Sequence, residues 1–139
     1  MANVPDALWA RLVGQTTVTD LVGTSPKRIY KQVIPQNSAM PCVCLREIDD
    51  VPDNHLTGAS GSASARYEVA SVATTPEGAI ALRAVVRAAL DRYRGTSNSL
   101  VIRDCVRTSG GIDELPPNES SDNWRYVATD EYEIGYQPS

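Results

Sequence analysis

The sequence predicts a single α+β domain, in which one largely antiparallel sheet of four to five strands carries its helices on one face. Two observations predict this class. Residues 75–94 have the periodicity of an amphipathic helix, and the runs on either side of it have the alternation and the β-branched residues of strands. A chain of 139 residues is also of the usual size for one domain, so residues 1–139 are interpreted as one unit.

The main helix is predicted over residues 75–94. Thr75 suits the N-cap, and Pro76 suits the first helical position, where no N–H is needed. Gly95 can adopt the left-handed conformation that ends a helix. Arg83 and Arg87 lie on the face opposite the apolar stripe. That stripe consists of residues at spacings of three and four, namely Leu82, Val85, Val86, Ala89, Leu90 and Tyr93.

The remaining elements are shorter. A helix is expected over residues 4–13, packed on the same face of the sheet as the main helix, with a further helical turn at 19–22. Extended segments are predicted at 28–34, 42–49, 66–73, 100–106 and 124–136. Two stretches rich in Pro, Gly, Asn and Ser, residues 50–64 and 109–123, are predicted to be mobile loops. In the last strand Asp130 interrupts an apolar face, which indicates a bulge or an interface contact.

Composition and charge exclude some classes of partner and compartment. Residues 109–139 have a charge balance of −6 against +2 for residues 1–108, and such an acidic chain does not favour non-specific nucleic-acid binding. The sequence contains no apolar run of membrane-spanning length and no basic-then-apolar leader, so neither a membrane partner nor a signal peptide is expected. Three cysteines, an odd number, favour a reducing compartment.

Candidate chemistry is sparse. A thiol nucleophile or a zinc site would have to use His55 with Cys42, Cys44 or Cys105, and there is no C-x-x-C pair. Cys-x-Cys on a strand puts two sulfurs on one face, about 6.6 Å apart at 3.3 Å per residue. Buried cysteines and a solvated histidine are therefore expected, with no catalytic residue, metal or cofactor. A small metal- or thiol-dependent enzyme using these four residues remains an alternative from a different class.

Four stretches, in this order, carry a resemblance to a known family. They are KRIYKQVIPQNSAMPCVCL (27–45), DNHLTG (53–58), ARYEVASVATTPEGAIALRAVVRAALDRYRG (65–95) and RYVATDEYEIGY (125–136). They resemble the tail-completion or tail-terminator proteins of long-tailed, siphovirus-type bacteriophages. In that family the main helix typically ends in an ALD-x-[FY]-x-G pattern, which residues 89–95 match. The resemblance covers nearly the whole chain and depends on the order and spacing of the motifs. The sequence departs from the family pattern in the acidic stretch 109–123.

The resemblance implies a non-enzymatic virion protein. Such proteins form a ring, typically a hexamer, on the head-proximal end of the tail tube, where they stop tube polymerisation and provide the surface for head-tail joining. The implied partners are further copies of the chain, the tail tube protein and a head-completion or connector protein, while DNA passes through the ring without specific binding. Assembly would take place in the cytoplasm of the bacterial host. A neck or head-completion protein, one layer higher in the same virion, is the alternative.

Three sets of residues are predicted to serve this ring. The stretch 50–64, with Asp53, Asn54, His55 and Leu56, is expected to contact the tube or a neighbouring subunit. Arg83 and Arg87 are expected to face solvent or a subunit. Glu131 and Glu133, or the 109–123 stretch, are expected to face the bore, where negative charge would let DNA slide.

Overall fold

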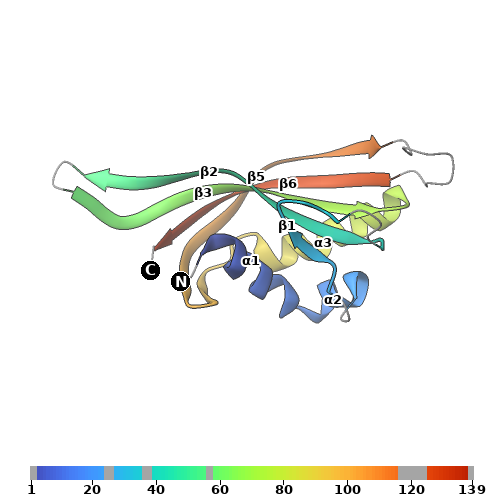
Figure 1. The fold of residues 1–139 in the computed structure, drawn as a ribbon, viewed down its shortest axis with the longest axis horizontal. Coiled ribbons are helices and arrows are strands. Elements are labelled where there is room, and N and C mark those ends of the chain that lie inside the picture. Colours follow the sequence, from blue (N-terminus) through green and yellow to red (C-terminus); the bar gives the residue numbers. More distant parts are fainter. Residues whose placement is uncertain (1–2, 24–26, 36–38, 56–57, 116–124, 138–139) are drawn as a thin grey trace.

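The computed structural model describes residues 3–23, 27–35, 39–55, 58–115 and 125–137, and it has the predicted α+β class (Figure 1). The helices are α1 (Val4–Val13), α2 (Thr16–Val22) and α3 (Pro76–Leu90). The strands are β1 (Ile29–Lys31), β2 (Cys42–His55), β3 (Gly58–Ala73), β4 (Gly95–Ser97), β5 (Leu100–Leu115) and β6 (Arg125–Gln137). In the described part of the chain the helices lie together on one side of the sheet (Figure 1).

The strands form one sheet in the order β1-β2-β3-β6-β5-β4. Every neighbouring pair is antiparallel except β1 and β2, which are parallel. The largely antiparallel character is confirmed, and in the described residues the sheet has six strands where four to five were predicted. The strand not predicted is β4, whose three residues, Gly95–Ser97, pair with the start of β5. A run this short carries no periodicity from which a strand can be recognised.

The prediction of a loop at residues 50–64 is wrong for the backbone that the structure describes there. Residues 50–55 and 58–64 continue β2 and β3 as a hairpin. Because β3 pairs with β6 only from Ala63 onward, the hairpin beyond that point is a two-stranded arm, which projects to the left in Figure 1. A proline, Pro52, lies at the base of the arm, and the register is irregular within the arm, between Asp53 and Asn54. Proline is tolerated at an edge strand, but it hides the strand from pattern analysis.

The predicted loop at 109–123 is also wrong where it can be compared. β5 continues to Leu115 and pairs with β6 as far as Arg125, so residues 109–115 are strand. Residues 116–123 of that prediction lie outside the described residues. The loop was predicted because this half of β5 contains residues that are uncommon in strands, namely Gly110, Gly111, Asp113 and Glu114.

The core lies between the sheet and the helices. Tyr67, Val69, Tyr132 and Ile134 point from the sheet into it, as their alternation predicts. Because the chain has no Phe, tyrosines supply the aromatic volume, and their hydroxyls bond to carboxylates: Tyr67 to Glu47 at 3.3 Å and Tyr136 to Asp50 at 2.7 Å. Further fully buried members of the core are Leu8, Leu12, Val18, Leu45, Leu82, Leu90, Leu100 and Ile102.

The other face of the sheet, called here the open face, carries no helix among the described residues (Figure 1). Cys42 and Cys44 alternate with the core residues Val43 and Leu45 and therefore point to this face. They pack there in a small second cluster with Ala70 and Val72. A groove of about 330 Å³ lies above this cluster, lined by Gln32, Val33, Ile34, Cys44, Arg46, Glu68, Ala70, Val72, Arg125 and Val127.

Helix α3 begins as predicted, with the Thr75 side chain accepting a hydrogen bond from the Gly78 N–H at 3.0 Å. It ends at Leu90, four residues before the predicted end. Asp91 is extended and Arg92 has a positive φ of 65°, while the Arg92 N–H donates to the Cys105 carbonyl at 2.6 Å. A contact with β5 therefore ends the helix, where helix propensity alone would have continued it.

Candidate functional site

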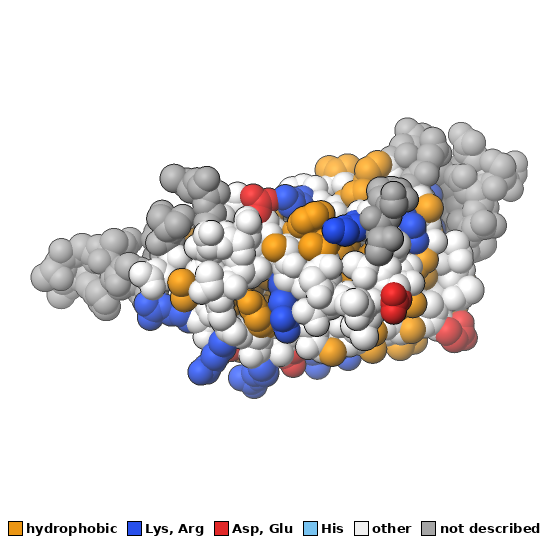
Figure 2. Space-filling view, turned by 90° about the horizontal axis from the view of Figure 1, so that it is seen from below, with side chains coloured by type: hydrophobic (Ala, Val, Ile, Leu, Met, Phe, Trp, Pro, Cys, Tyr) orange, Lys and Arg blue, Asp and Glu red, His pale blue; other side chains and the backbone are white. Residues whose placement is uncertain are grey.

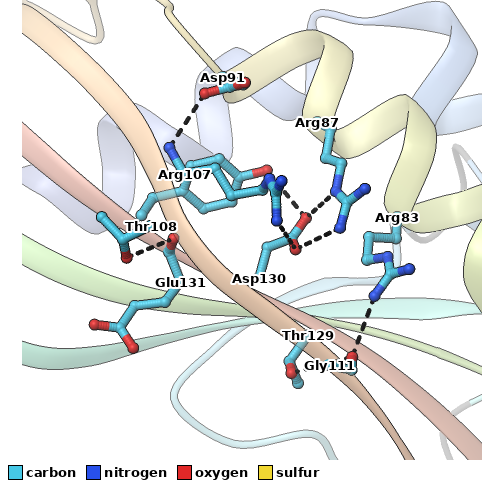
Figure 3. Close-up of polar contacts among 10 residues, drawn as sticks. Arg83, Arg87, Asp91, Arg107, Thr108, Gly111, Thr129, Asp130 and Glu131 are labelled. Atoms are coloured by element: carbon cyan, nitrogen blue, oxygen red, sulfur yellow. Dashed lines mark hydrogen bonds and ion pairs between the residues drawn. The ribbon is translucent and has the colours of Figure 1, made fainter.

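A buried carboxylate joins α3 to the sheet. Asp130 on β6 is 1% exposed, and both its oxygens accept hydrogen bonds from Arg87 of α3, at 2.6 Å from Nε and 2.9 Å from Nη2 (Figure 3). Arg107 of β5 places its Nη1 3.7 Å from the same carboxylate. The hydrogen bonds that Arg87 donates to Asp130 raise the pKa of Arg87 above its ordinary value, so its guanidinium stays charged. Two neighbouring strands and the main helix thus meet at Asp130.

The backbone of β5 leaves room for this carboxylate. Gly110 lies directly opposite Asp130 in the β5–β6 ladder. A Cβ atom at Gly110 would stand 2.4 Å from Asp130 Oδ1, whereas a Cβ atom at Gly111 would meet nothing within 4 Å. Close approach of a buried side chain therefore explains the first glycine of the pair and leaves the second without a packing reason.

Two further contacts tie β5 to α3. Arg83 Nη1 donates to the Gly111 carbonyl at 3.2 Å, and the Arg107 N–H donates to Asp91 Oδ1 at 3.1 Å (Figure 3). Arg83 and Arg87, both predicted to face solvent or a subunit, are therefore engaged within the chain while remaining partly exposed. Their role at an interface stays a prediction.

The two carboxylates predicted to face the bore lie on the open face. Glu133 is exposed, and Glu131 forms an ion pair with Arg66 at 3.4 Å. Arg66 also binds Asp49 at 2.7 Å, and its hydrogen bond lowers the pKa of the Asp49 carboxyl. The negative charge of Glu131 is thus partly balanced within the chain, and that of Glu133 is more available to the surroundings.

The residues predicted to contact the tube follow one another at the tip of the arm. Asp53, Asn54 and His55 are the last three residues of β2, with Asp53 opposite Ser62 and His55 opposite Gly58. Leu56 lies outside the described residues. The structure therefore brings the described three to the far end of a hairpin, where sequence reasoning expected them in a loop.

The three cysteines do not come together. Cys42 and Cys44 lie under the open face, and Cys105 belongs to the core on the helix side. Burial raises the pKa of Cys42 to about 11 and that of Cys105 to about 12, which disfavours the thiolate needed for a nucleophile or a zinc ligand. Among the described residues, no group of three or more His, Cys, Asp or Glu side chains is placed to hold a metal ion.

The buried thiols make a prediction about reactivity and pH. In the folded protein all three cysteines should react with a thiol reagent such as Ellman's reagent at pH 8 at least about 100-fold more slowly than in urea. Because burial raises their pKa above the unfolded value, their contribution to stability should be complete below about pH 8.5 and be lost as pH rises toward 11–12. Fast modification of one thiol in the folded state would contradict this.

The chain is similar to known proteins both in sequence family and in fold. A family model described as "Tail completion protein gp17" matches residues 6–114. The search of curated proteins found no match. Among solved structures, a chain of the "Virion of native gene transfer agent (GTA) particle" is similar with a TM-score of 0.71 and 19% sequence identity, covering 95% of this chain and 92% of the other. At that identity the likeness shows a shared fold.

The described helices include none long and apolar enough to cross a membrane.

The family model spans more than three-quarters of the sequence, from α1 to the end of β5, and so includes α3 and the β2–β3 arm. The family that the sequence motifs suggested, phage tail-completion proteins, is therefore confirmed by the family model. The chain belongs to the tail completion protein gp17 family.

Proposed function

We propose that the chain is a tail terminator: a structural protein that forms a ring on the head-proximal end of the tail tube and ends tube growth. The family match over residues 6–114 carries this proposal. The proposal is supported by the fold, which is shared with a chain of the virion of a gene transfer agent particle. No catalytic step is needed for this role. The ring would then provide the surface on which a filled head is joined.

The arm is the proposed contact with the tube or with a neighbouring subunit. Its backbone is paired only within the hairpin, so one edge of each strand is open for further hydrogen bonds over residues 51–55 and 58–62 of the described chain. Open strand edges pair readily with another chain. A two-stranded ribbon is marginally stable alone, so binding would also stabilise the arm itself.

The open face is the proposed lining of the bore. Glu133, with Glu131, would place carboxylates toward passing DNA, although Arg66 offsets part of this charge in each copy. Six copies at a formal net charge of −4 would carry about −24 in total, which disfavours non-specific retention of a polyanion. The connector protein would meet the ring on its head-facing side.

The ring is tested by mass and by capping. Light scattering of the purified protein, alone and with tail tubes of the same virus, should detect a discrete species of about six protomers, and electron microscopy should show it at one end of each tube. Tubes grown with the protein should have a narrow length distribution. A protein that stays monomeric on added tubes and leaves their ends bare would exclude the terminator function.

The arm is tested by shortening it at its base. Replacing residues 53–62 by Asn-Gly joins Pro52 to Ala63 through a two-residue hairpin turn, and the pairing of β3 with β6 from Ala63 onward is kept. The shortened protein should unfold at nearly the wild-type temperature but cap tubes at least about tenfold less well, which corresponds to about 1.4 kcal/mol of binding free energy. Normal capping by a folded, shortened protein would show that the arm makes no essential contact.

A further inference from the structure

Strand β5 separates two stretches of opposite charge. Residues 92–107 contain four arginines and one aspartate, whereas residues 109–124 contain four carboxylates and no basic residue. The first stretch runs from just after α3 through β4 and the first half of β5, and the second begins in the second half of β5. The formal net charge of −4 for the whole chain does not reveal this separation of positive from negative charge along the sequence.

The positive charges form an exposed surface, called here the basic end, made of Arg92, Arg94 and Arg103. Arg94 is 75% exposed, and its guanidinium approaches Asp104 only to 4.0 Å. Arg103 is exposed and contacts a neutral group, Gln137, at 3.3 Å. Figure 2, which views the helix-covered side, shows a group of Lys and Arg side chains at the lower left, with further ones spread over the rest of this face. These charges are therefore available to a partner.

The carboxylates that follow in β5, Asp113 and Glu114, are called here the acidic end. Both side chains are exposed, and neither forms an ion pair within the described chain. Two arginines of this region have other positions or partners. Arg83 donates to the Gly111 carbonyl, and Arg125 lies opposite Leu115 in the β5–β6 ladder. The acidic end therefore also lacks a partner within the described chain.

Distance prevents the two ends from neutralising each other in one copy. Arg103 and Asp113 are ten residues apart on one strand, about 33 Å at 3.3 Å per residue. The Debye length at physiological ionic strength is about 8 Å, so their attraction within a chain is screened out. In a second copy, by contrast, the acidic end can come into direct contact with the basic end of the first.

We propose that neighbouring copies of this chain meet head to tail, the basic end of one against the acidic end of the next. The inference rests on the proposed ring and names the surfaces that close it. A contact between two different surfaces of identical chains repeats around a closed ring and uses each surface once per copy. The complementary charges also set the polarity of assembly, because basic-to-basic and acidic-to-acidic encounters repel.

Charge reversal tests the contact with two variants. Arg94→Glu with Arg103→Glu makes both ends acidic, and Asp113→Lys with Glu114→Lys makes both ends basic. Each variant alone should lose ring formation on tail tubes by at least about tenfold, and an equimolar mixture should recover it, since the two kinds of copy can alternate. Lys27→Glu with Lys31→Glu, which changes net charge by the same amount as the first variant at exposed positions elsewhere, should assemble as wild type.

The outcomes separate the inference from the function. Ring mass and tube capping by the wild-type protein test the ring itself, and thermal unfolding confirms that each variant is folded. If wild-type rings form but the mixture recovers no more than its components, the head-to-tail contact is wrong and the terminator function stands. If the basic-end variant assembles normally but loses binding to a DNA duplex that wild type binds, the basic end serves DNA, and the proposed contact is overturned.

Discussion

Replacing Arg87 with methionine is expected to lower the free energy of unfolding by about 3 kcal/mol, because Asp130 would remain buried without its main partner. Methionine keeps an apolar stem on α3 and removes only the guanidinium. Breaking a buried pair costs about 3–5 kcal/mol, and the lower end applies because the Arg87 side chain is 35% exposed and Arg107 stays 3.7 Å from the carboxylate. Urea unfolding followed by far-ultraviolet circular dichroism measures the change.

Arg83→Met is the matched control, one turn earlier on the same helix. Arg83 loses only a partly exposed hydrogen bond to the Gly111 carbonyl, so about 1 kcal/mol or less is expected. In the double variant, Arg87→Met with Asp130→Asn, the buried charge is gone, and unfolding should be less easy than in Arg87→Met alone. Equal losses for Arg83→Met and Arg87→Met would contradict the central role of Asp130.

Elements with a strong local pattern could be predicted from sequence. Helix α1 covers the predicted residues Val4–Val13, and α3 starts at the predicted N-cap, Thr75. The strand alternation is also confirmed, with Tyr132 and Ile134 buried between partly or fully exposed glutamates. In each of these elements the periodicity arises from one buried face, so sequence and structure report the same physical fact.

Elements whose stability comes from distant residues could not be predicted. The arm is held by pairing between β2 and β3 although its residues are small or polar, and the end of α3 is set by a hydrogen bond to Cys105 in β5. Tertiary contacts override local propensity at both places. Asp130 was recognised as an interruption of an apolar face, but its partner Arg87 is 43 residues away in sequence, and no spacing rule connects them.

The candidate site divides in the same way. The separation of the cysteines between two faces follows from strand alternation, which puts Cys42 and Cys44 opposite Val43 and Leu45. The charge asymmetry at residue 108 was visible in sequence, but its meaning depends on the extended course of β5, which carries the two signs to separate ends. A loop at 109–115, as predicted, would have let the charges approach each other.

Gly110→Ala is expected to lower the free energy of unfolding by about 2 kcal/mol, within the range for inserting a methyl group into a filled site. The new Cβ would stand 2.4 Å from Asp130 Oδ1 and 3.0 Å from the Thr129 carbonyl oxygen. Asp130 cannot swing aside without losing its two hydrogen bonds to Arg87. Gly110 has no positive φ, so the penalty arises from contact and not from backbone strain. Urea denaturation again measures it.

Gly111→Ala, at the next residue, separates this contact from any general effect of replacing a glycine in β5. Its Cβ would meet nothing within 4 Å, so stability should stay within about 0.5 kcal/mol of wild type or rise slightly as the unfolded chain loses freedom. In the Arg87→Met background the Gly110→Ala penalty should shrink, because the carboxylate is then free to move. If both alanines are tolerated equally, Gly110 is not required by Asp130, and the packing of β5 against the buried ion pair is looser than the distances indicate.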